Sequence, residues 1–395
     1  MSGPRRIAPF WAGEEEQDSA TEGRETMPAI QAITMPKWGL AMEEGMLARW
    51  GVEEGTEIGL GDEIMDIETS KIANVFESPV KGTLRRKVVA EGDTVPVGAL
   101  LGVVSEGEVS DADIEAFVAD FLARFKPAEK GDADGPRAEP ISVNGRTIRH
   151  LRLGPDAGTP VVMIHGFGAD LATWMFNQEA LAADRPVYAL DLPGHGGSSK
   201  EVDDGSAAAL ARTVLAYLDA AGIERAHLVG HSLGGAIAVE IAAAAPERVT
   251  ALTLVAPAGF GTEIAGDFIA GFIAESRSRK LRPVLEMLVA NPEMVSADMV
   301  EDVLKFKRLD GATAALSAIA AANFAGDTQK LSLRERLKDV AVPVHVVWGE
   351  ADRILPAAQA EGLPASVRVT RVPGAGHIAH MEKASEINTI IKSTG

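Results

Sequence analysis

An internal repeat constrains the front of this 395-residue chain more than any other feature of its sequence. When the sequence is shifted by 37 residues, matching residues fall on one another: Gly45 on Gly82, Leu47 on Leu84, Glu54 on Glu91, Gly55 on Gly92, Ile58 on Val95, Gly61 on Gly98 and Ile64 on Leu101. Two halves of short strands with glycine turns predict a small all-β barrel or sandwich with approximate twofold symmetry. Residues 64–76 join the halves and read as strand, tight turn and strand, with Lys71 at an exposed tip.

The repeat region resembles the lipoyl domain of 2-oxoacid and acetoin dehydrogenase complexes over about residues 30–107. The matching motifs are M-P-K-W-G at 35–39, E-T-S-K at 68–71 and S-P-V-K-G at 78–82. The resemblance implies that lipoate is attached covalently to Lys71. Biotin carriers share this fold but usually have methionine on both sides of the lysine, so Ser70 and Ile72 favour lipoate. The alternative is an ordinary exposed lysine in a hairpin.

The segments around this domain have the composition of extensions and linkers. Residues 1–29 are rich in Glu, Gly, Ser and Thr and are predicted to be disordered, and either Met1 or Met27 remains open as the start. Residues 108–139 are predicted to be a linker that contains an amphipathic helix at 111–126. Its apolar stripe either packs on the protein's own body or binds another subunit.

Composition excludes several classes of function. The net charge is −19, of which −14 falls in the first 139 residues, and this argues against nucleic acid as a partner. The chain has no cysteine, which excludes disulfides, thiolate metal sites and a cysteine nucleophile, and we predict no metal site. The sequence shows no transmembrane run and no secretory signal, so we expect a cytoplasmic protein without a membrane partner.

From residue 140 to 395 the pattern changes to short apolar strands that alternate with helices. The predicted strands are Val161–His165, Val187–Asp191, His227–Gly230, Leu252–Ala256, Val344–Trp348 and Val367–Val372. Continuous apolar runs of this kind indicate a buried, mostly parallel sheet flanked by helices. Residues 259–330 interrupt the alternation with a helical pattern and are predicted to form a cap. The fold class is therefore multidomain, an all-β carrier domain followed by an α/β domain with a helical cap.

A serine nucleophile is predicted in the motif G-H-S-L-G at 230–234, which lies between a strand and an Ala-rich helix. Ser232 would need a base and an acid that follow it in the order Ser, acid, His. His377 follows the last strand and is the predicted base, and Asp352 follows the preceding strand and is the predicted acid. Glu350 is the alternative acid, and His380 is interpreted as a neighbour of the base.

Backbone N–H groups are expected to stabilise the oxyanion. The predicted donors are Phe167, in H-G-F-G after the first long strand, and Leu233, which follows the nucleophile. His165 and His195 are interpreted as structural members of their loops.

Residues 140–394 resemble the α/β-hydrolase superfamily through H-G-F-G, D-L-P-G-H-G-G-S, G-H-S-L-G, G-E-A-D and G-A-G-H, in family order. The pairing of both domains resembles the acyltransferase component of acetoin dehydrogenase systems. That resemblance implies transfer of acetyl from lipoyl-Lys71 to coenzyme A. It also implies partnership with thiamine-diphosphate-dependent subunits and dihydrolipoamide dehydrogenase. The alternative is an esterase or thioesterase with a lipoyl delivery arm.

The sequence departs from ordinary acyltransferase components of such complexes, because their H-x-x-x-D-G motif and a compact subunit-binding domain are both absent from it. A basic cluster in the predicted cap is the one candidate for the phosphates of coenzyme A, and the alternative is a solvated helix face. The cluster consists of Arg277, Arg279, Lys280 and Arg282.

Overall fold

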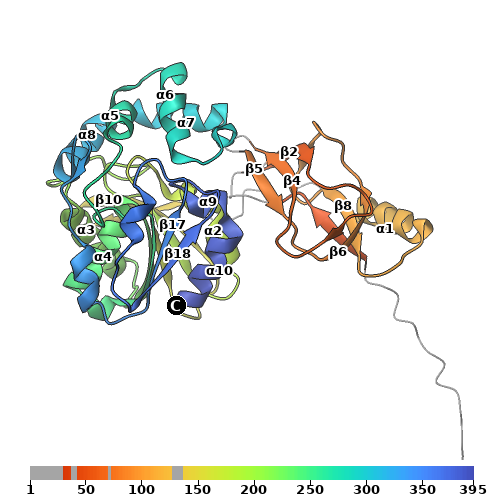
Figure 1. Ribbon diagram of the computed structural model, residues 1–395, viewed down its shortest axis with the longest axis horizontal. Coiled ribbons are helices and arrows are strands. Elements are labelled where there is room, and N and C mark those ends of the chain that lie inside the picture. The colour runs from red at the N-terminus through yellow and green to blue at the C-terminus, as the bar shows by residue number, and fades with distance from the viewer. Residues whose placement is uncertain (1–29, 37–41, 70–72, 127–136) are drawn as a thin grey trace, which may run out of the picture.

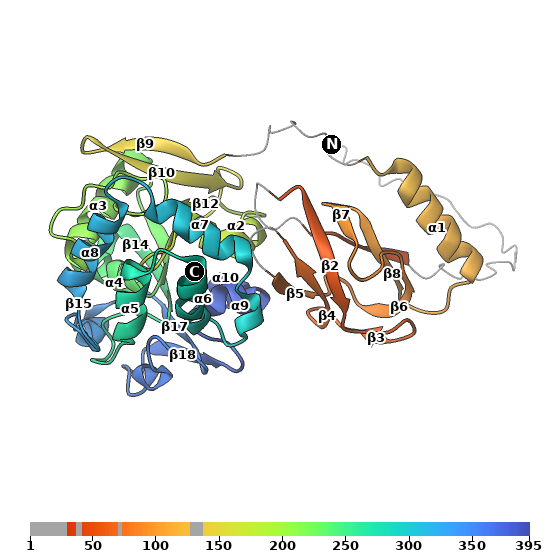
Figure 2. The ribbon, with the colours of Figure 1, turned by 90° about the horizontal axis from the view of Figure 1, so that it is seen from above.

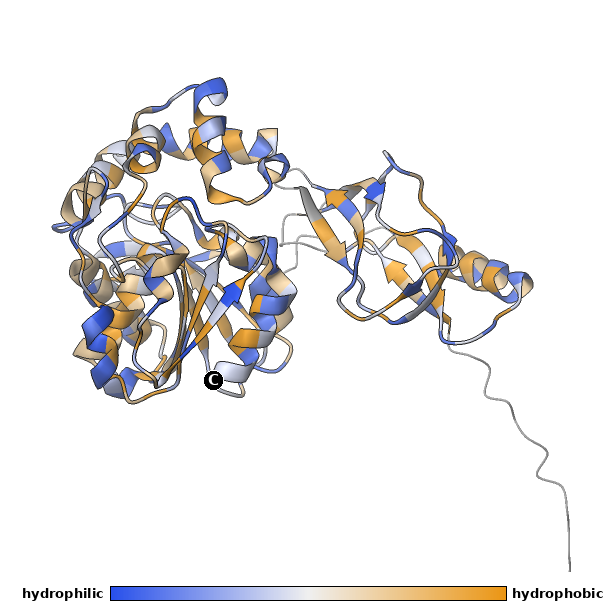
Figure 3. Cartoon of the chain, in the orientation of Figure 1, coloured by the Kyte–Doolittle hydropathy of each residue, from blue (hydrophilic) through white to orange (hydrophobic). Residues whose placement is uncertain are grey.

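The computed structural model describes residues 30–36, 42–69, 73–126 and 137–395. They form a β-sandwich with one attached helix, here called the carrier domain, and a larger α/β domain (Figures 1 and 2). Hydrophobic residues concentrate in the strands of both domains, as the orange segments of Figure 3 show. No helix in the described ranges has the length and apolar character needed to cross a membrane.

The carrier domain is a sandwich of two four-stranded sheets, with the orders β1-β8-β6-β3 and β5-β4-β2-β7. Its strands are β1 (Ile30–Thr34), β2 (Glu44–Trp50), β3 (Glu57–Ile58), β4 (Glu63–Glu68), β5 (Ala73–Glu77), β6 (Gly82–Lys87), β7 (Thr94–Pro96) and β8 (Leu100–Ser105). Leu47, Ile67 and Leu84 are fully buried between the sheets. The alternation of buried and exposed residues along each strand produces this core.

The predicted twofold repeat is present in the backbone. Gly55 and Gly92, which the 37-residue shift superimposes, have φ angles of 89° and 87°. Gly55 N–H donates to the carbonyl of Leu84, and Gly92 N–H donates to the carbonyl of Leu47, both at 2.7 Å. Leu47 and Leu84 are themselves repeat equivalents, so each half closes its turn against the other half.

Helix α1 (Asp111–Arg124) is two residues shorter than predicted and packs on the carrier domain. Ser110 caps its start by accepting a hydrogen bond from Asp113 N–H. Ile114 is buried against Leu100 and Val103 of β8, whereas Leu122 is 53 % exposed. The apolar stripe therefore packs in part on the carrier domain, and the interpretation that it binds another subunit stays a prediction.

The α/β domain is built on an eight-stranded sheet with the order β18-β17-β14-β13-β11-β12-β10-β9. Its strands are β9 (Glu139–Val143), β10 (Arg146–Leu153), β11 (Val161–Ile164), β12 (Val187–Leu190), β13 (Ala226–His231), β14 (Val249–Val255), β17 (Val344–Gly349) and β18 (Val367–Val372). The six predicted strands pair in parallel. β9 and β10, which the sequence analysis did not predict, add an antiparallel pair at one edge.

Helices cover both faces of this sheet and carry their apolar residues inward. The main helices against the two faces are α2 (Met175–Leu181), α3 (Ala207–Ala220), α4 (Leu233–Ala244) and α10 (Ala384–Thr394). Side chains of α3 and α4 share one core with Val162 and Ile164, and those of α2 and α10 share the other with Val161 and Met163. This alternation along β11 explains the continuous apolar run, because both faces are buried.

The predicted cap is an insertion between β14 and β17. Its elements are α5 (Gly266–Ala274), α6 (Ser278–Leu285), α7 (Ala297–Lys307), α8 (Ala312–Asn323), β15 (Phe324–Ala325) and β16 (Thr328–Gln329). Figure 1 shows these helices above one end of the sheet. The carrier domain meets the α/β domain through an ion pair between Glu63 and Lys383, whose atoms are 2.6 Å apart.

Candidate active site

The nucleophile lies in a strained turn between β13 and α4. Ser232 has φ 51° and ψ −116°, one of three positive φ values among the described non-glycine residues. Gly230 and Gly234 are required beside it because a Cβ on Gly234 would lie 2.1 Å from the carbonyl oxygen of Ile164, and a Cβ on Gly230 would lie 2.4 Å from that of Gly234. The strained turn at the end of a strand places the serine hydroxyl above the sheet.

The predicted base and acid are hydrogen-bonded to each other. His377 Nδ1 lies 2.8 Å from Asp352 Oδ2, and the two side chains are 3 % and 0 % exposed. Asp352 Oδ1 also accepts hydrogen bonds from Ile354 N–H and Leu355 N–H, at 2.8 and 3.0 Å. These bonds hold the carboxylate so that Nδ1 keeps its proton and Nε2 can act as a base. Glu350, the alternative acid, is exposed.

Ser232 and His377 line the same cavity, but no hydrogen bond joins their side chains among the described residues. Catalytic hydrogen bonds are often long without substrate and tighten in the complex, so this geometry is compatible with a serine–histidine pair. The structure therefore brings the three predicted residues to one site, with the His377–Asp352 contact already formed.

Both predicted oxyanion donors have available N–H groups. In the described residues, the backbone N–H of Phe167 and that of Leu233 donate to no protein acceptor. Leu233 is the first residue of α4, so its N–H also lies at the positive end of the helix dipole. Phe167 lines the cavity beside Ser232.

Two buried histidines fix the loop that carries Phe167, as the sequence interpretation proposed. His195 Nε2 accepts from Gly168 N–H at 3.1 Å, and His165 Nε2 accepts from Leu192 N–H at 3.0 Å. Burial lowers the pKa of His165 to about 4 and that of His195 to about 3. Both rings are therefore neutral near pH 7 and can accept these bonds.

A buried histidine stack supports the catalytic loop from behind. His231 Nε2–H donates to the carbonyl of His377 at 3.0 Å, and its ring centroid lies 4.6 Å from that of His380. Burial lowers the pKa of His380 to about 3. The His380 ring packs on Trp174, and its Nε2 lies 3.1 Å from Thr173 Oγ1, which agrees with its interpretation as a neighbour of the base.

Glu382 is a structural member of the site that sequence reasoning missed. Its carboxylate accepts hydrogen bonds from Gly376 N–H and Ala290 N–H, both at 2.6 Å. It thereby joins the loop of His377 to a segment of the cap, and burial raises its pKa. No local sequence signal marks Glu382. It lies in a helical turn, Ala290 is 92 residues away in the sequence, and Gly376 belongs to no motif that calls for a carboxylate.

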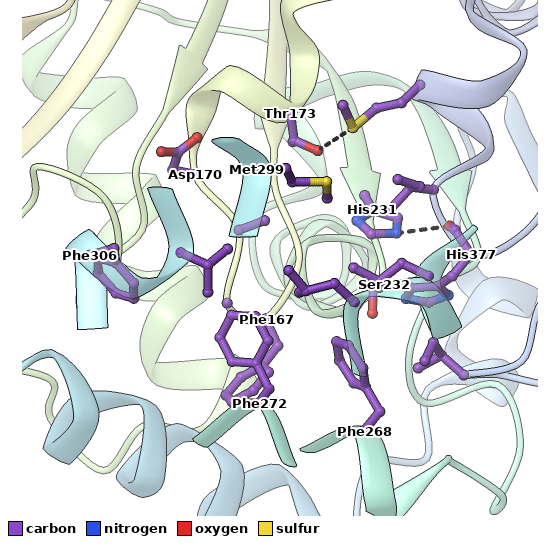
Figure 4. Close-up of a pocket in the computed structure, with 18 of the residues that line it drawn as sticks. Phe167, Asp170, Thr173, His231, Ser232, Phe268, Phe272, Met299, Phe306 and His377 are labelled. Atoms are coloured by element: carbon purple, nitrogen blue, oxygen red, sulfur yellow. Dashed lines mark hydrogen bonds between the residues drawn. The ribbon is translucent and has the colours of Figure 1, made fainter. Parts of the chain in front are cut away.

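The cap and the ends of the strands enclose a cavity of about 190 Å³ above Ser232. Figure 4 shows Ser232 and His377 on one side and Phe167, Phe272 and Phe306 on the other. The walls are mainly aromatic and aliphatic, with a few polar groups at the catalytic end and around Asp170. Ligand sites typically have this combination of apolar walls and few polar groups.

The two remaining predicted features are Lys71 and the basic cluster of the cap. Lys71 falls outside the described residues, between β4 and β5, whose ends pair at Glu68 and Ala73. A connection between paired antiparallel strands is compatible with attachment of a prosthetic group to Lys71. The basic cluster of the cap is mostly exposed on α6 and the residue before it, and Arg282 lies 3.7 Å from Glu286.

The fold and the site define the α/β domain as a member of the α/β-hydrolase class. Residues 159–384 match the model of the alpha/beta hydrolase fold, and residues 31–104 match the model described as biotin-requiring enzyme. Among solved structures, a meta-cleavage product hydrolase of Pseudomonas fluorescens has a TM-score of 0.59 at 21 % identity and covers 65 % of this chain and 96 % of its own. A 2-hydroxy-6-oxo-6-phenylhexa-2,4-dienoate hydrolase of Rhodococcus has a TM-score of 0.59 at 22 % identity, covering 66 % and 98 %. These neighbours show the fold alone.

Curated relatives match almost the whole chain, including both domains. The dihydrolipoyllysine-residue acetyltransferase component of the acetoin cleaving system of Pseudomonas putida is 47 % identical over 92 % of this chain and 97 % of its own length. The component of the same name from Cupriavidus necator is 46 % identical over 93 % and 98 %. The chain belongs to this family of acetyltransferase components, in which a lipoyl-type domain precedes an α/β-hydrolase domain.

Proposed function

We propose that this chain moves an acetyl group from a thioester on lipoyl-Lys71 to coenzyme A through Ser232, His377 and Asp352. The observation that carries the proposal is the union, in one chain, of a lipoyl-type carrier domain and a buried Ser-His-Asp arrangement. A carrier of acyl thioesters and an acyl-transfer site are complementary, and the relatives matched over almost the whole chain are named acetyltransferase components.

When bound, lipoate supplies a thiol that carries the acetyl group as a thioester. His377 Nε2 takes the proton of Ser232 Oγ as Oγ attacks the carbonyl carbon. The N–H groups of Phe167 and Leu233 stabilise the oxyanion. As the C–S bond breaks, His377 returns the proton to the departing sulfur and the acetyl group remains on Ser232.

The second half repeats these steps in reverse order. His377 takes the proton of the coenzyme A thiol, the sulfur attacks the acetyl-serine carbonyl, and Ser232 Oγ leaves with the proton from His377. The exposed Arg277, Arg279 and Lys280 have no ion-pair partner in the described residues and offer charges for the phosphates of coenzyme A. Thiamine-diphosphate-dependent subunits and dihydrolipoamide dehydrogenase are the partners we propose for supplying the acetyl group and reoxidising lipoate.

The competing function is hydrolysis of an ester or thioester, with water as the acceptor. The same serine and histidine can activate water in place of the coenzyme A thiol, so this alternative is kept. The two functions differ in one product. Acetyl-dihydrolipoamide would be incubated with the full chain, with and without coenzyme A, and acetyl-CoA would be measured against free acetate.

We expect acetyl-CoA to dominate when coenzyme A is present and Ser232→Ala to abolish its formation. Acetate as the main product, at a rate that coenzyme A does not change, would establish the hydrolase instead. Full transfer by Ser232→Ala would exclude the serine mechanism.

A further inference from the structure

The cavity above Ser232 is larger than the acetyl group requires. An acetyl group has three non-hydrogen atoms, whereas the cavity measures about 190 Å³. About 10–15 Å³ of such cavity volume is enough to hold one water molecule, so an acetyl group leaves most of the cavity unfilled. Apolar surface that stays unfilled or hydrated forgoes the free energy of burial. The size therefore indicates a longer substrate group.

The position of His377 decides which end of a substrate occupies the extra volume. The departing sulfur takes its proton from His377, so the thiol portion must lie on the side of that residue. The acyl chain then extends away from His377, past the oxyanion donors. Figure 4 shows Phe167, Phe272 and Phe306 on that opposite side.

The walls on this side are preformed. Phe272 is 2 % exposed, and its ring centroid lies 5.9 Å from that of Phe167. Phe324 packs on Phe167 in turn, at 6.2 Å. α7 contributes Met299 and Val303 to the lining of the cavity. Interlocking rings resist collapse, so the volume remains available to a ligand.

A carboxylate lies on the side of the cavity away from His377 (Figure 4). Asp170 lines the cavity, and its Oδ1 accepts a hydrogen bond from Ala172 N–H at 2.8 Å. In the described ranges no cation lies within ion-pair distance of Asp170, whereas Asp302, which also lines the cavity, pairs with Lys305 at 3.1 Å. An acyl chain that ended in its own carboxylate would meet the like charge of Asp170 there, which is unfavourable.

We propose that this cavity is an acyl-chain site that accepts unbranched, uncharged acyl groups of about four to six carbons as well as acetyl, and that Asp170 excludes acyl groups with a terminal carboxylate. The proposal rests on the proposed function, because it takes Ser232 as the acyl acceptor. The chemistry is unchanged: the C–S bond of the donor breaks, the acyl group passes to Ser232, and coenzyme A receives it.

The test is a chain-length series on one thiol. Acetyl, butyryl, hexanoyl and succinyl thioesters of N-acetylcysteamine would be supplied to the full chain with coenzyme A, and kcat/KM measured. Each buried methylene adds about fourfold until the cavity is full, so butyryl, with two more methylenes, should exceed acetyl by about fifteenfold, and succinyl should fall below butyryl by a factor of about ten or more. A decline from acetyl to butyryl would overturn the proposal.

Two substitutions on α7 test whether the dependence of kcat/KM on acyl-chain length arises in this cavity. Val303→Phe on α7 should lower the hexanoyl-to-acetyl ratio of kcat/KM by about tenfold, because the larger side chain takes up part of the cavity that Val303 lines. Ala297→Phe places the same ring at an exposed position on the same helix and should leave the ratio unchanged. If Val303→Phe does not fold, Met299→Phe serves the same purpose. An unchanged ratio in a folded Val303→Phe variant contradicts the site.

Asp170→Asn tests the charge with little change of shape, because asparagine keeps the oxygen that accepts from Ala172 N–H. The succinyl-to-butyryl ratio should rise by about tenfold, and an unchanged ratio would contradict the role of Asp170. Calorimetric titration of Ser232→Ala with hexanamide and acetamide gives a readout independent of turnover, with tighter binding expected for hexanamide. If the wild-type chain transferred no acyl group at all while hexanamide still bound, the proposed function would fail and the cavity assignment would stand.

Discussion

The carrier domain contains no histidine, whereas all eight histidines of the chain lie between residues 150 and 380 of the α/β domain. The carrier domain is a symmetric sandwich, and its predicted reactive residue, Lys71, falls in a connection between strands. The α/β domain holds its reactive groups in buried hydrogen-bond networks around His377. A carrier needs only a stable scaffold, whereas an acyl-transfer site needs fixed neutral imidazoles and a fixed carboxylate. Substitution and acid should therefore affect the two domains differently.

The largest expected effect concerns the acid of the site. Asp352→Asn removes the charge that orients His377 and stabilises its imidazolium, and we expect acetyl-CoA formation to fall about a thousandfold or more. Glu350→Gln changes a nearby exposed carboxylate and should leave the rate within about twofold, because it lies outside the His377 contact. Equal losses in both variants would show that Asp352 has no special role.

Acid should destabilise the α/β domain selectively. Burial lowers the pKa of His165 and His227 to about 4 and that of His195 and His380 to about 3. Below pH 6.5 these histidines bind protons in the unfolded chain but stay neutral in the folded chain. Their contribution to the free energy of unfolding is therefore present above that pH and is lost as the pH falls. At pH 5.5 the shift costs the folded state about 1.4 kcal/mol for each of these four histidines, roughly 6 kcal/mol together. Burial raises the pKa of Asp191 to about 6, which offsets about 1 kcal/mol of this loss.

The measurement is thermal unfolding of the full chain at pH 7 and pH 5.5, followed by the indole NMR signals of Trp50 and Trp348. Trp50 lies in the carrier core and Trp348 in the α/β core. The Trp348 transition should move to lower temperature by more than the Trp50 transition. Equal shifts of both transitions would contradict the assignment of the acid response to buried histidines.

Substitution of one glycine in each domain compares how tightly the backbone of the two domains is packed. A Cβ on Gly234 would meet two backbone carbonyl oxygens, at 2.1 and 2.6 Å, whereas a Cβ on Gly55 would meet nothing within 4 Å. Gly234→Ala should destabilise the α/β domain by about 4 kcal/mol or more, because backbone must move. Gly55→Ala should cost the carrier domain only about 1–2 kcal/mol, from its positive φ. Urea unfolding of both variants checks this, and a larger loss for Gly55→Ala would reverse the comparison.

The fold was predictable where the sequence pattern is local and dense. The 37-residue repeat predicted the sandwich because paired glycines such as Gly55 and Gly92 must occupy equivalent turns, and their φ angles agree. The parallel strands followed from apolar runs buried on both faces. β9 and β10 were missed because an edge pair has one exposed face and many polar residues, so its pattern resembles a loop.

The site was predictable where a motif dictates geometry and unpredictable where packing alone does. G-H-S-L-G predicted the strained turn at Ser232, and the order of elements predicted the contact of Asp352 with His377. Glu382 and the walls of the cavity come together only through the placement of the cap, which no local pattern encodes.

The central claim is that the acyl group passes through Ser232. The direct measurement is peptide mass analysis of the full chain after incubation with acetyl-dihydrolipoamide without an acceptor thiol. We predict one acetyl group on the peptide that contains Ser232, its loss when coenzyme A is added, and an equal amount of acetyl-CoA formed. An unmodified Ser232 peptide, together with undiminished acetyl-CoA formation by Ser232→Ala, would contradict the account.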